Sequence, residues 1–328
     1  MPRLILLLAC LAVAGVTTPR PSMADPHQPY PNRPIRMIVP FPPGGAADVT
    51  ARTLAQAMST GIGQPVAVEN RAGAGGAIGT EAAARAAADG YTVLLVDRGV
   101  LGMAPSLYQT PRFDPKTSFA YVGIVTEGPY VLVVDPAIGV GTMQDIVARA
   151  KSAPKPMAYG SFGVGSMAHL NIEALKAALG IDLQHIPYKG SAEAVNAVAN
   201  GEVQVALVAP PAALEFVRAK RIKALVVGAA ARVPQLPDVP TLAESGYPAD
   251  LLLPTFFALA APAGTPAPIV GRLNAEMRKA VHQPETASRL VTMGLIPVGS
   301  DPEQAAATVA RDVVRFGAIA ARVGITPQ

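Results

Sequence analysis

The stretch VPFPPGGAADVTARTL, residues 39 to 54, decides the fold of this chain. It leads from an apolar strand through two prolines and two glycines into a helix that carries little charge. A helix start leaves about four backbone N–H groups without intrahelical partners, and the helix dipole places roughly half a positive charge there. Glycine lets a ligand approach such N–H groups closely. We therefore interpret this turn as a backbone site for an anion.

Strand and helix patterns alternate on both sides of this turn. We expect strands over residues 35–41, 64–70 and 91–97 and helices over residues 46–63 and 76–90. Such alternation predicts an α/β fold with a mostly parallel, doubly wound sheet, whose ligands bind at the carboxyl ends of the strands.

Two strand-like stretches, near 121–134 and 255–261, bracket a middle block with its own alternation. Two chain crossings between two α/β halves would explain this pattern. We predict that domain I consists of residues 25–125 plus 256–328 and domain II of residues 126–255. A two-strand hinge and a ligand cleft between the domains follow from that division.

The first 24 residues are typical of a secretory signal peptide, with Arg3, an apolar run and Ser22-Met23-Ala24 before Asp25. The apolar run is about a dozen residues long, whereas roughly 20 are needed to span a bilayer. We expect a periplasmic protein with a cleaved signal peptide. The alternative is lipid anchoring at Cys10, because LLAC at 7–10 resembles a lipoprotein cleavage box.

Several classes of chemistry are disfavoured by composition. Cys10 is the only cysteine, so the mature chain would have no disulfide, no catalytic thiolate and no cysteine-held metal. Removal of Arg3 and Arg20 with the signal peptide lowers the formal net charge from +4 to +2, too little to indicate nucleic acid binding. The histidines show no HExxH motif and no paired spacing. We expect no catalytic residue, no metal and no cofactor, and we expect a monomer.

Three glycine-rich turns, at 43–45, 71–80 and 160–166, each lead into a helix. Turns of this kind aimed at one cleft would hold carboxylates through backbone N–H groups. Gly73, Gly75 and Gly79 could instead form a variant dinucleotide fingerprint, although their spacing is GxGxxxG and not GxGxxG. Ser161 and His169 could act as a nucleophile and a base only if the fold brings them together.

Arg98 follows the strand expected at 91–97, where strand ends face the predicted cleft. One interpretation is a fork that grips a ligand carboxylate through two parallel hydrogen bonds. The other is a solvated arginine or a partner of the neighbouring Asp97.

Several motifs in a fixed order give the chain a family resemblance. They are YPNRPIRMIVPFPPGGAADVTAR, GQPVAVENRAGAGGAIGTEAAARAAADGYTVLL, APSLY, IPYKGSAEA, LPDVPTLAESG and LAAPAGTPAPIVGRLNAEM. Together they cover essentially the whole mature chain, which resembles the tripartite tricarboxylate transporter receptors, the Bug-type periplasmic solute-binding proteins. The resemblance implies a type II periplasmic binding protein fold that closes on a small organic carboxylate. It also implies a receptor without enzymatic activity that delivers its ligand to integral membrane permease subunits.

The resemblance further implies which residues hold the ligand, largely through backbone groups and ordered waters. In the first domain they are Phe41, Pro43, Gly44, Gly45, Ala46 and Asp48. In the second domain they are Ser161, Gly165, Ser166, Met167, Tyr188, Lys189, Gly190 and Ser191.

The chain departs from the family pattern at three places. It has Asp97-Arg98-Gly99 where relatives have a Ser-rich segment, Phe162 and Val164 in the second-domain turn, and Val208-Ala209-Pro210 where many relatives have an Asp followed shortly by a Ser. We therefore add Arg98, Phe162 and Val208 to the expected ligand site. These changes remove polar partners, so we predict a ligand with an apolar or aromatic body. The alternatives are a ligand-sensing partner of a signalling protein and a periplasmic hydrolase.

Overall fold

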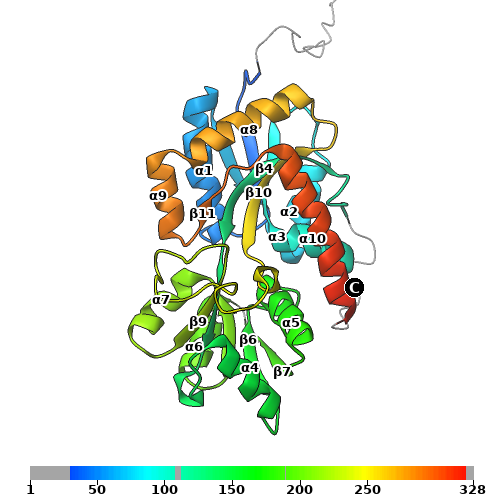
Figure 1. The fold of residues 1–328 in the computed structure, drawn as a ribbon. Coiled ribbons are helices and arrows are strands. Elements are labelled where there is room, and N and C mark those ends of the chain that lie inside the picture. Colours follow the sequence, from blue (N-terminus) through cyan, green and yellow to red (C-terminus); the bar gives the residue numbers. More distant parts are fainter. Residues whose placement is uncertain (1–29, 108–111, 189, 323–328) are drawn as a thin grey trace, which may run out of the picture.

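The computed structural model describes residues 30–107, 112–188 and 190–322, and the strands in these ranges form two separate sheets (Figure 1). The predicted signal peptide and Cys10 lie outside the described residues. We call each sheet with its covering helices a lobe. The expected α/β class, with two sheets and helices around them, is confirmed.

The first lobe contains a six-stranded sheet in the order β11-β4-β10-β3-β1-β2. Its strands are β1 (Ile35–Val39), β2 (Val66–Asn70), β3 (Thr92–Asp97), β4 (Phe119–Gly128), β10 (Thr255–Pro262) and β11 (Ile296–Pro297). Its helices are α1 (Ala46–Ile62), α2 (Ala77–Ala84), α3 (Arg98–Leu107), α8 (Ala267–Val281), α9 (Pro284–Thr292) and α10 (Pro302–Arg322). Apolar side chains of α1, α8, β1 and β3 form one core on one side of this sheet.

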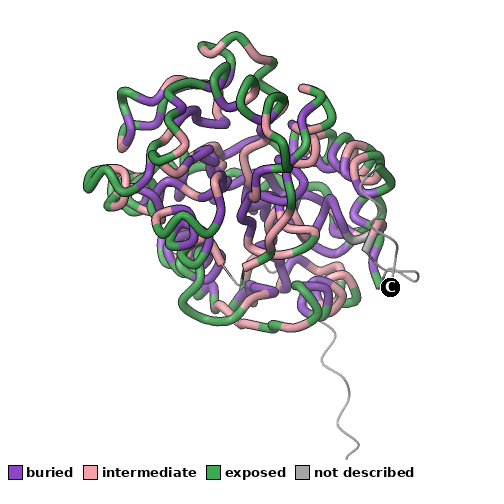
Figure 2. The backbone as a smooth tube through the Cα atoms, turned by 90° about the horizontal axis from the view of Figure 1, so that it is seen from below, coloured by how far each residue is buried: buried purple, intermediate pink, exposed green. Residues whose placement is uncertain are grey.

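The second lobe contains a five-stranded sheet in the order β7-β6-β8-β5-β9. Its strands are β5 (Tyr130–Val134), β6 (Met157–Ser161), β7 (Leu183–Pro187), β8 (Val205–Val208) and β9 (Lys223–Gly228). Its helices are α4 (Met143–Ser152), α5 (Met167–Leu179), α6 (Ser191–Ala199) and α7 (Pro210–Arg218). Buried segments run through the interior of the molecule, with exposed turns around them (Figure 2).

Strand directions place the functional loops of both lobes on facing edges. β4 runs antiparallel to β10, and β10 runs antiparallel to β3, so β3 and β4 point the same way, and β1 and β2 are parallel to β3. β5 begins two residues after β4 ends, and it is antiparallel to β8, which is parallel to β6. The carboxyl ends of β1, β2 and β3 therefore face the carboxyl ends of β6, β7 and β8.

The chain passes between the lobes twice, from β4 to β5 through Pro129 and from residue 252 into β10. Proline has no N–H to donate to a sheet ladder, which suits the short link between β4 and β5. Glu127 and Gly128 belong to β4, so the expected boundary between residues 125 and 126 falls inside a strand of the first lobe.

Helix α10 extends beyond its own lobe. Figure 1 shows it running from the first lobe down beside the second, and Phe316 and Ala320 pack in the hydrophobic core that contains Leu170 of α5. Met103 of α3 belongs to the same core. The two lobes thus share a packed contact on this side.

Helix α3 is an element that the sequence pattern did not predict. The segment contains three poor helix formers, Gly99, Gly102 and Pro105, so its sequence did not indicate a helix. Tertiary packing explains it, because Gly102 lies directly against the buried ring of Phe316 in α10.

Gly102→Ala should lower the free energy of unfolding by about 1–3 kcal/mol, because its Cβ would overlap the Phe316 ring. Gly271→Ala on α8 is the control: this glycine faces open space, so alanine should stabilise by about 0.5–1 kcal/mol. Urea unfolding of the two variants measures both effects. Equal effects of the two substitutions would contradict the close α3–α10 packing.

Candidate ligand-binding site

The turn between β1 and α1 exposes backbone at the first-lobe edge. Gly44, Gly45 and Ala46 are exposed, and Gly44 has a φ of 84°, a conformation that favours glycine. Gly45 is the N-cap of α1 and supplies no side-chain hydrogen bond to the helix. The first N–H groups of α1 therefore point to the inter-lobe side without an intrahelical partner.

Asp48 supports this turn from inside. It is buried, and its Oδ2 accepts from the Gly44 N–H at 2.9 Å and from Arg52 Nε at 3.0 Å, while Oδ1 accepts from Asn70 Nδ2 at 2.9 Å. Hydrogen bonding to Arg52, together with the Gly44 and Asn70 bonds, lowers the pKa of Asp48 to about 2. Both carboxylate oxygens accept hydrogen bonds from the protein, so Asp48 shapes the turn.

The turn between β6 and α5 occupies the second-lobe edge. Ser161 is fully buried, and its Oγ lies 2.6 Å from His185 Nε2 on β7 and 3.1 Å from the Gly163 N–H. Ser166 is the N-cap of α5, where its Oγ accepts from the His169 N–H at 3.3 Å. Met167, the first residue of α5, is buried.

Two stacked imidazoles hold this second turn. The rings of His169 and His185 are parallel within 10° and their centroids are 4.1 Å apart. His169 Nδ1 accepts from the Gly165 N–H at 3.1 Å, so this amide, which we expected to bind ligand, is already paired. Burial, and next the His169 ring, lower the pKa of His185 to about 4, and burial lowers the pKa of His169 as well. Both rings are therefore neutral at pH 7.

The turn after β7 lies beside Ser161, the last residue of β6. The Tyr188 N–H donates to the Ser161 carbonyl at 2.8 Å, and Gly190 is an N-cap of α6 without a side-chain hydrogen bond. Lys189 lies outside the described residues, and Ser191 begins α6.

Val208 and Phe162, two apolar residues expected in the ligand site, lie in different surroundings. Val208 ends β8 and is fully buried, so it contributes to the core of its lobe. Phe162 is only partly buried and stacks on Tyr130, the first residue of β5, with 6.1 Å between ring centroids. Tyr130 and Phe162 thus place an aromatic pair where the chain crosses between the lobes.

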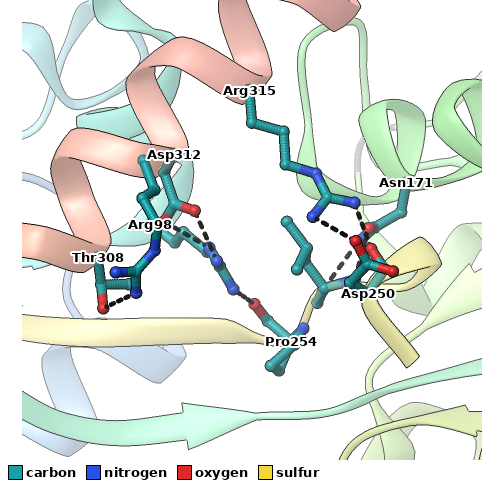
Figure 3. A network of polar contacts seen from close by, with 9 residues as sticks. Arg98, Asn171, Asp250, Pro254, Thr308, Asp312 and Arg315 are labelled. Atoms are coloured by element: carbon teal, nitrogen blue, oxygen red, sulfur yellow. Dashed lines mark hydrogen bonds and ion pairs between the residues drawn. The ribbon is translucent and has the colours of Figure 1, made fainter. Parts of the chain in front are cut away.

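The expectation that Arg98 grips a ligand carboxylate needs correction. Its guanidinium is buried and donates to Asp312 from Nε at 2.8 Å and from Nη2 at 2.7 Å, while Nη1 donates to the Pro254 carbonyl at 2.6 Å (Figure 3). The fork geometry expected from the sequence is present, but the carboxylate belongs to α10. Arg98, the first residue of α3, therefore ties α3 and α10 to the second crossing of the chain.

Figure 3 also shows a second connection beside this one. Arg315 of α10 extends toward Asp250 of the second lobe, with Nη1 3.5 Å from Asp250 Oδ2. Asn171 of α5 bonds both the N–H and the carbonyl of Leu253, which precedes Pro254. The second crossing is thus held by both lobes.

The glycines at 71–80 also have a structural role. A Cβ at Gly79 would lie 2.8 Å from Pro40 Cα, and one at Gly76 would lie 2.8 Å from Val100 Cγ2. These glycines let α2 pack closely against β1 and α3. Of the three glycines in the dinucleotide interpretation, Gly79 packs against the end of β1, whereas Gly75 is exposed.

Two residues of the site were missed by sequence reasoning. His185 lies on β7 and no motif pairs it with Ser161, so only the fold brings the two together. Asp97 was considered as a partner of Arg98 and as part of the dinucleotide interpretation, but not as part of the carboxylate site, although it ends β3 at the inter-lobe edge. Among the described residues no group of three or more His, Cys, Asp or Glu side chains could hold a metal ion. In the same ranges, no helix combines the length and apolarity that crossing a bilayer requires.

Comparison with known proteins identifies the family. Residues 50–325 match the family model described as tripartite tricarboxylate transporter family receptor. The chain belongs to this family. It is 37% identical to protein BugT of Bordetella pertussis over 326 residues, covering 99% of this chain and 98% of that protein.

Solved structures of relatives share the fold and include ligand complexes. R. palustris Rpa4515 with adipate has 32% identity and a TM-score of 0.75, and the match covers 91% of this receptor and 100% of that chain. MatC (Rpa3494) from Rhodopseudomonas palustris with bound malate has 30% identity and a TM-score of 0.71, with 88% and 99% covered. The receptor thus has the periplasmic binding protein fold expected from the sequence, and its family consists of solute-binding receptors rather than enzymes.

Asp312→Asn should lower the free energy of unfolding of the receptor by about 3–5 kcal/mol, because it leaves the buried Arg98 guanidinium without its carboxylate. Asp250→Asn is the matched control. Asp250 is 70% exposed and its ion pair with Arg315 is long, so the loss should stay below about 1 kcal/mol. Chemical unfolding of both variants tests the difference, and a similar small loss in both would refute the role of the buried pair.

The stacked histidines predict a pH dependence of stability. The pKa of His185 falls from 6.5 to about 4 in the native state, so the unfolded chain binds this proton first as the pH falls. The His185 contribution is present above pH 6.5 and is lost between pH 6.5 and about 4. His185→Gln should therefore lose less stability than the wild type between pH 7 and pH 5.

Comparison of the two proteins isolates His185 from other groups. Asp97, whose pKa is raised from 3.8 to about 6, acts in the opposite direction but is present in both. Asp48 loses its contribution only below pH 3.8. Identical pH slopes in urea unfolding of the two proteins would show that the stack is not held neutral.

Proposed function

We propose that this receptor captures a small organic carboxylate between its two lobes and delivers it to a tripartite tricarboxylate-type permease in the membrane. The observation that carries the proposal is the pair of helix starts on the facing edges. Exposed N–H groups at Gly45 and Ala46 lie on one edge, and the first turn of α5 lies on the other. Such groups suit a carboxylate because they offer hydrogen-bond donors together with the positive ends of helix dipoles.

The relatives support the ligand class. Adipate and malate, which are bound in two of the related structures, are both small organic carboxylates. We propose that the two bodies that close on the ligand follow the predicted division into residues 25–125 plus 256–328 and residues 126–255, except that residues 126–128 and 255 move with the first body because they belong to β4 and β10. Secretion to the periplasm as a monomer, with cleavage of residues 1–24, is part of the same proposal.

The ligand that we propose has an apolar or aromatic body. Phe162 and Tyr130 offer an aromatic surface at the crossing, and Met167 adds an apolar side chain. An apolar ligand body gains about 25 cal/mol for each Å² that it covers. A hydroxyl or amine left unpaired against such surfaces costs roughly 1–3 kcal/mol. Small acids that carry hydroxyl or amino groups and have little apolar surface, such as citrate and aspartate, should therefore bind weakly.

A thermal-shift screen of organic acids tests the proposed function. Benzoate-like and alkyl acids should raise the Tm of the receptor by several degrees, because saturation at 100 times Kd stabilises by about 2.7 kcal/mol. Citrate and aspartate should raise it less. Stabilisation by citrate and aspartate but not by the apolar acids would refute the proposed ligand class, and no shift with any organic acid would refute carboxylate capture.

A further inference from the structure

Asp97 places a carboxylate at the first-lobe edge of the proposed ligand site. It is the last residue of β3, paired in register with Phe257 of β10. Its Oδ1 accepts from the Val100 N–H at 2.8 Å, so the side chain caps the start of α3. A serine could make the same cap without adding a charge.

The Asp97 carboxylate has no cation beside it in the part of the chain that the structure describes. The next residue, Arg98, donates from Nε, Nη1 and Nη2 to Asp312 and Pro254. No ion pair of Asp97 occurs among the described residues. Burial raises the pKa of Asp97 to about 6, as expected for a charge without a partner.

The surroundings of Asp97 on the second lobe are apolar or aromatic. A Cβ placed at Gly99 would lie 3.5 Å from Asp97 Oδ1 and 3.7 Å from Met167 Cγ, so the carboxylate and the start of α5 approach each other across the lobes. Tyr130 of β5 is an ionisable group close to it: burial, and next the negative charge of Asp97, raise the pKa of the Tyr130 phenol. A neutral phenol supplies no positive charge.

We propose that Asp97 determines specificity, by accepting a hydrogen bond from a protonated nitrogen on the ligand. The inference rests on the proposed function and narrows it to acids that carry an amino group at the end remote from the carboxylate. A second ligand carboxylate at this point would be repelled, whereas an ammonium group would supply the positive charge that Asp97 lacks, since its partners among the described residues are the backbone N–H groups of Val100 and Gly99.

The geometry of the first sheet fits such a ligand. β1 and β3 are neighbouring strands, about 4.8 Å apart, so the start of α1 and Asp97 lie on one edge. A carboxylate at Gly45 and Ala46 and an ammonium at Asp97 would therefore be joined by a short apolar chain or ring. The apolar body of the proposed ligand class supplies that link.

Calorimetric titration with two pairs of acids tests the inference. The pairs are hexanoate with 6-aminohexanoate and benzoate with 4-(aminomethyl)benzoate, each measured on the wild type, Asp97→Asn and Asp135→Asn. Asparagine caps helices as well as aspartate does, so α3 should remain intact in Asp97→Asn. Asp135 caps a short helical turn far along the second lobe, accepting from the Ala137 N–H at 2.8 Å, and serves as the matched control.

In the wild type and in Asp135→Asn, the amino acid of each pair should bind about tenfold or more tightly than the plain acid. In Asp97→Asn this ratio should fall to about threefold or less. Equal binding of both members by the wild type, or an unchanged ratio in Asp97→Asn, would overturn the inference while leaving carboxylate capture in place. If none of the four acids binds the wild type, the inference falls together with the proposed ligand class.

Discussion

The direct continuation of β4 into β5 is the constraint on which the rest of the structure depends. Only Pro129 separates the two strands, so the direction of the first sheet sets the direction of the second. Because β3 runs parallel to β4 and β8 runs antiparallel to β5, the carboxyl ends of the parallel strands meet between the lobes. Every loop that the proposed function uses follows one of these strand ends.

Each lobe holds its turn at the inter-lobe edge with different chemistry. In the first lobe a buried carboxylate, Asp48, binds the Gly44 N–H and two side chains, and its low pKa keeps it charged. In the second lobe two neutral imidazoles bind Ser161 and Gly165. In the proposed function the first N–H groups of α1 and α5 bind the anion, because these supporting groups take other donors. The lobes themselves are joined by the Arg98–Asp312 pair and by the packing of α10 on α5.

Local patterns in the sequence predicted much of this. Glycine and proline around 42–45 predicted the turn, and the strand and helix patterns at 35–41, 46–63 and 91–97 correspond to β1, α1 and β3. Helix α3 was missed, since its glycines and proline oppose a helix and only its packing against Phe316 explains it. The internal ion pair of Arg98 could not be predicted either, because its partner Asp312 is 214 residues away in the sequence. Sequence indicated which residues carry charge and which turns expose backbone, but not which charges the fold pairs internally.

Amide hydrogen exchange tests the central claim most directly, namely that backbone N–H groups from both lobes bind one carboxylate. Exchange is compared between the free receptor and the receptor saturated with the acid that stabilises it best. We predict slower exchange at residues 45–47 and at residues 167–168 together, and the protection at both sites should saturate at the same ligand concentration, whereas the Gly44 and Ser166 N–H groups already have protein partners. Slower exchange on one lobe alone, or only at sites away from the two helix starts, would contradict it.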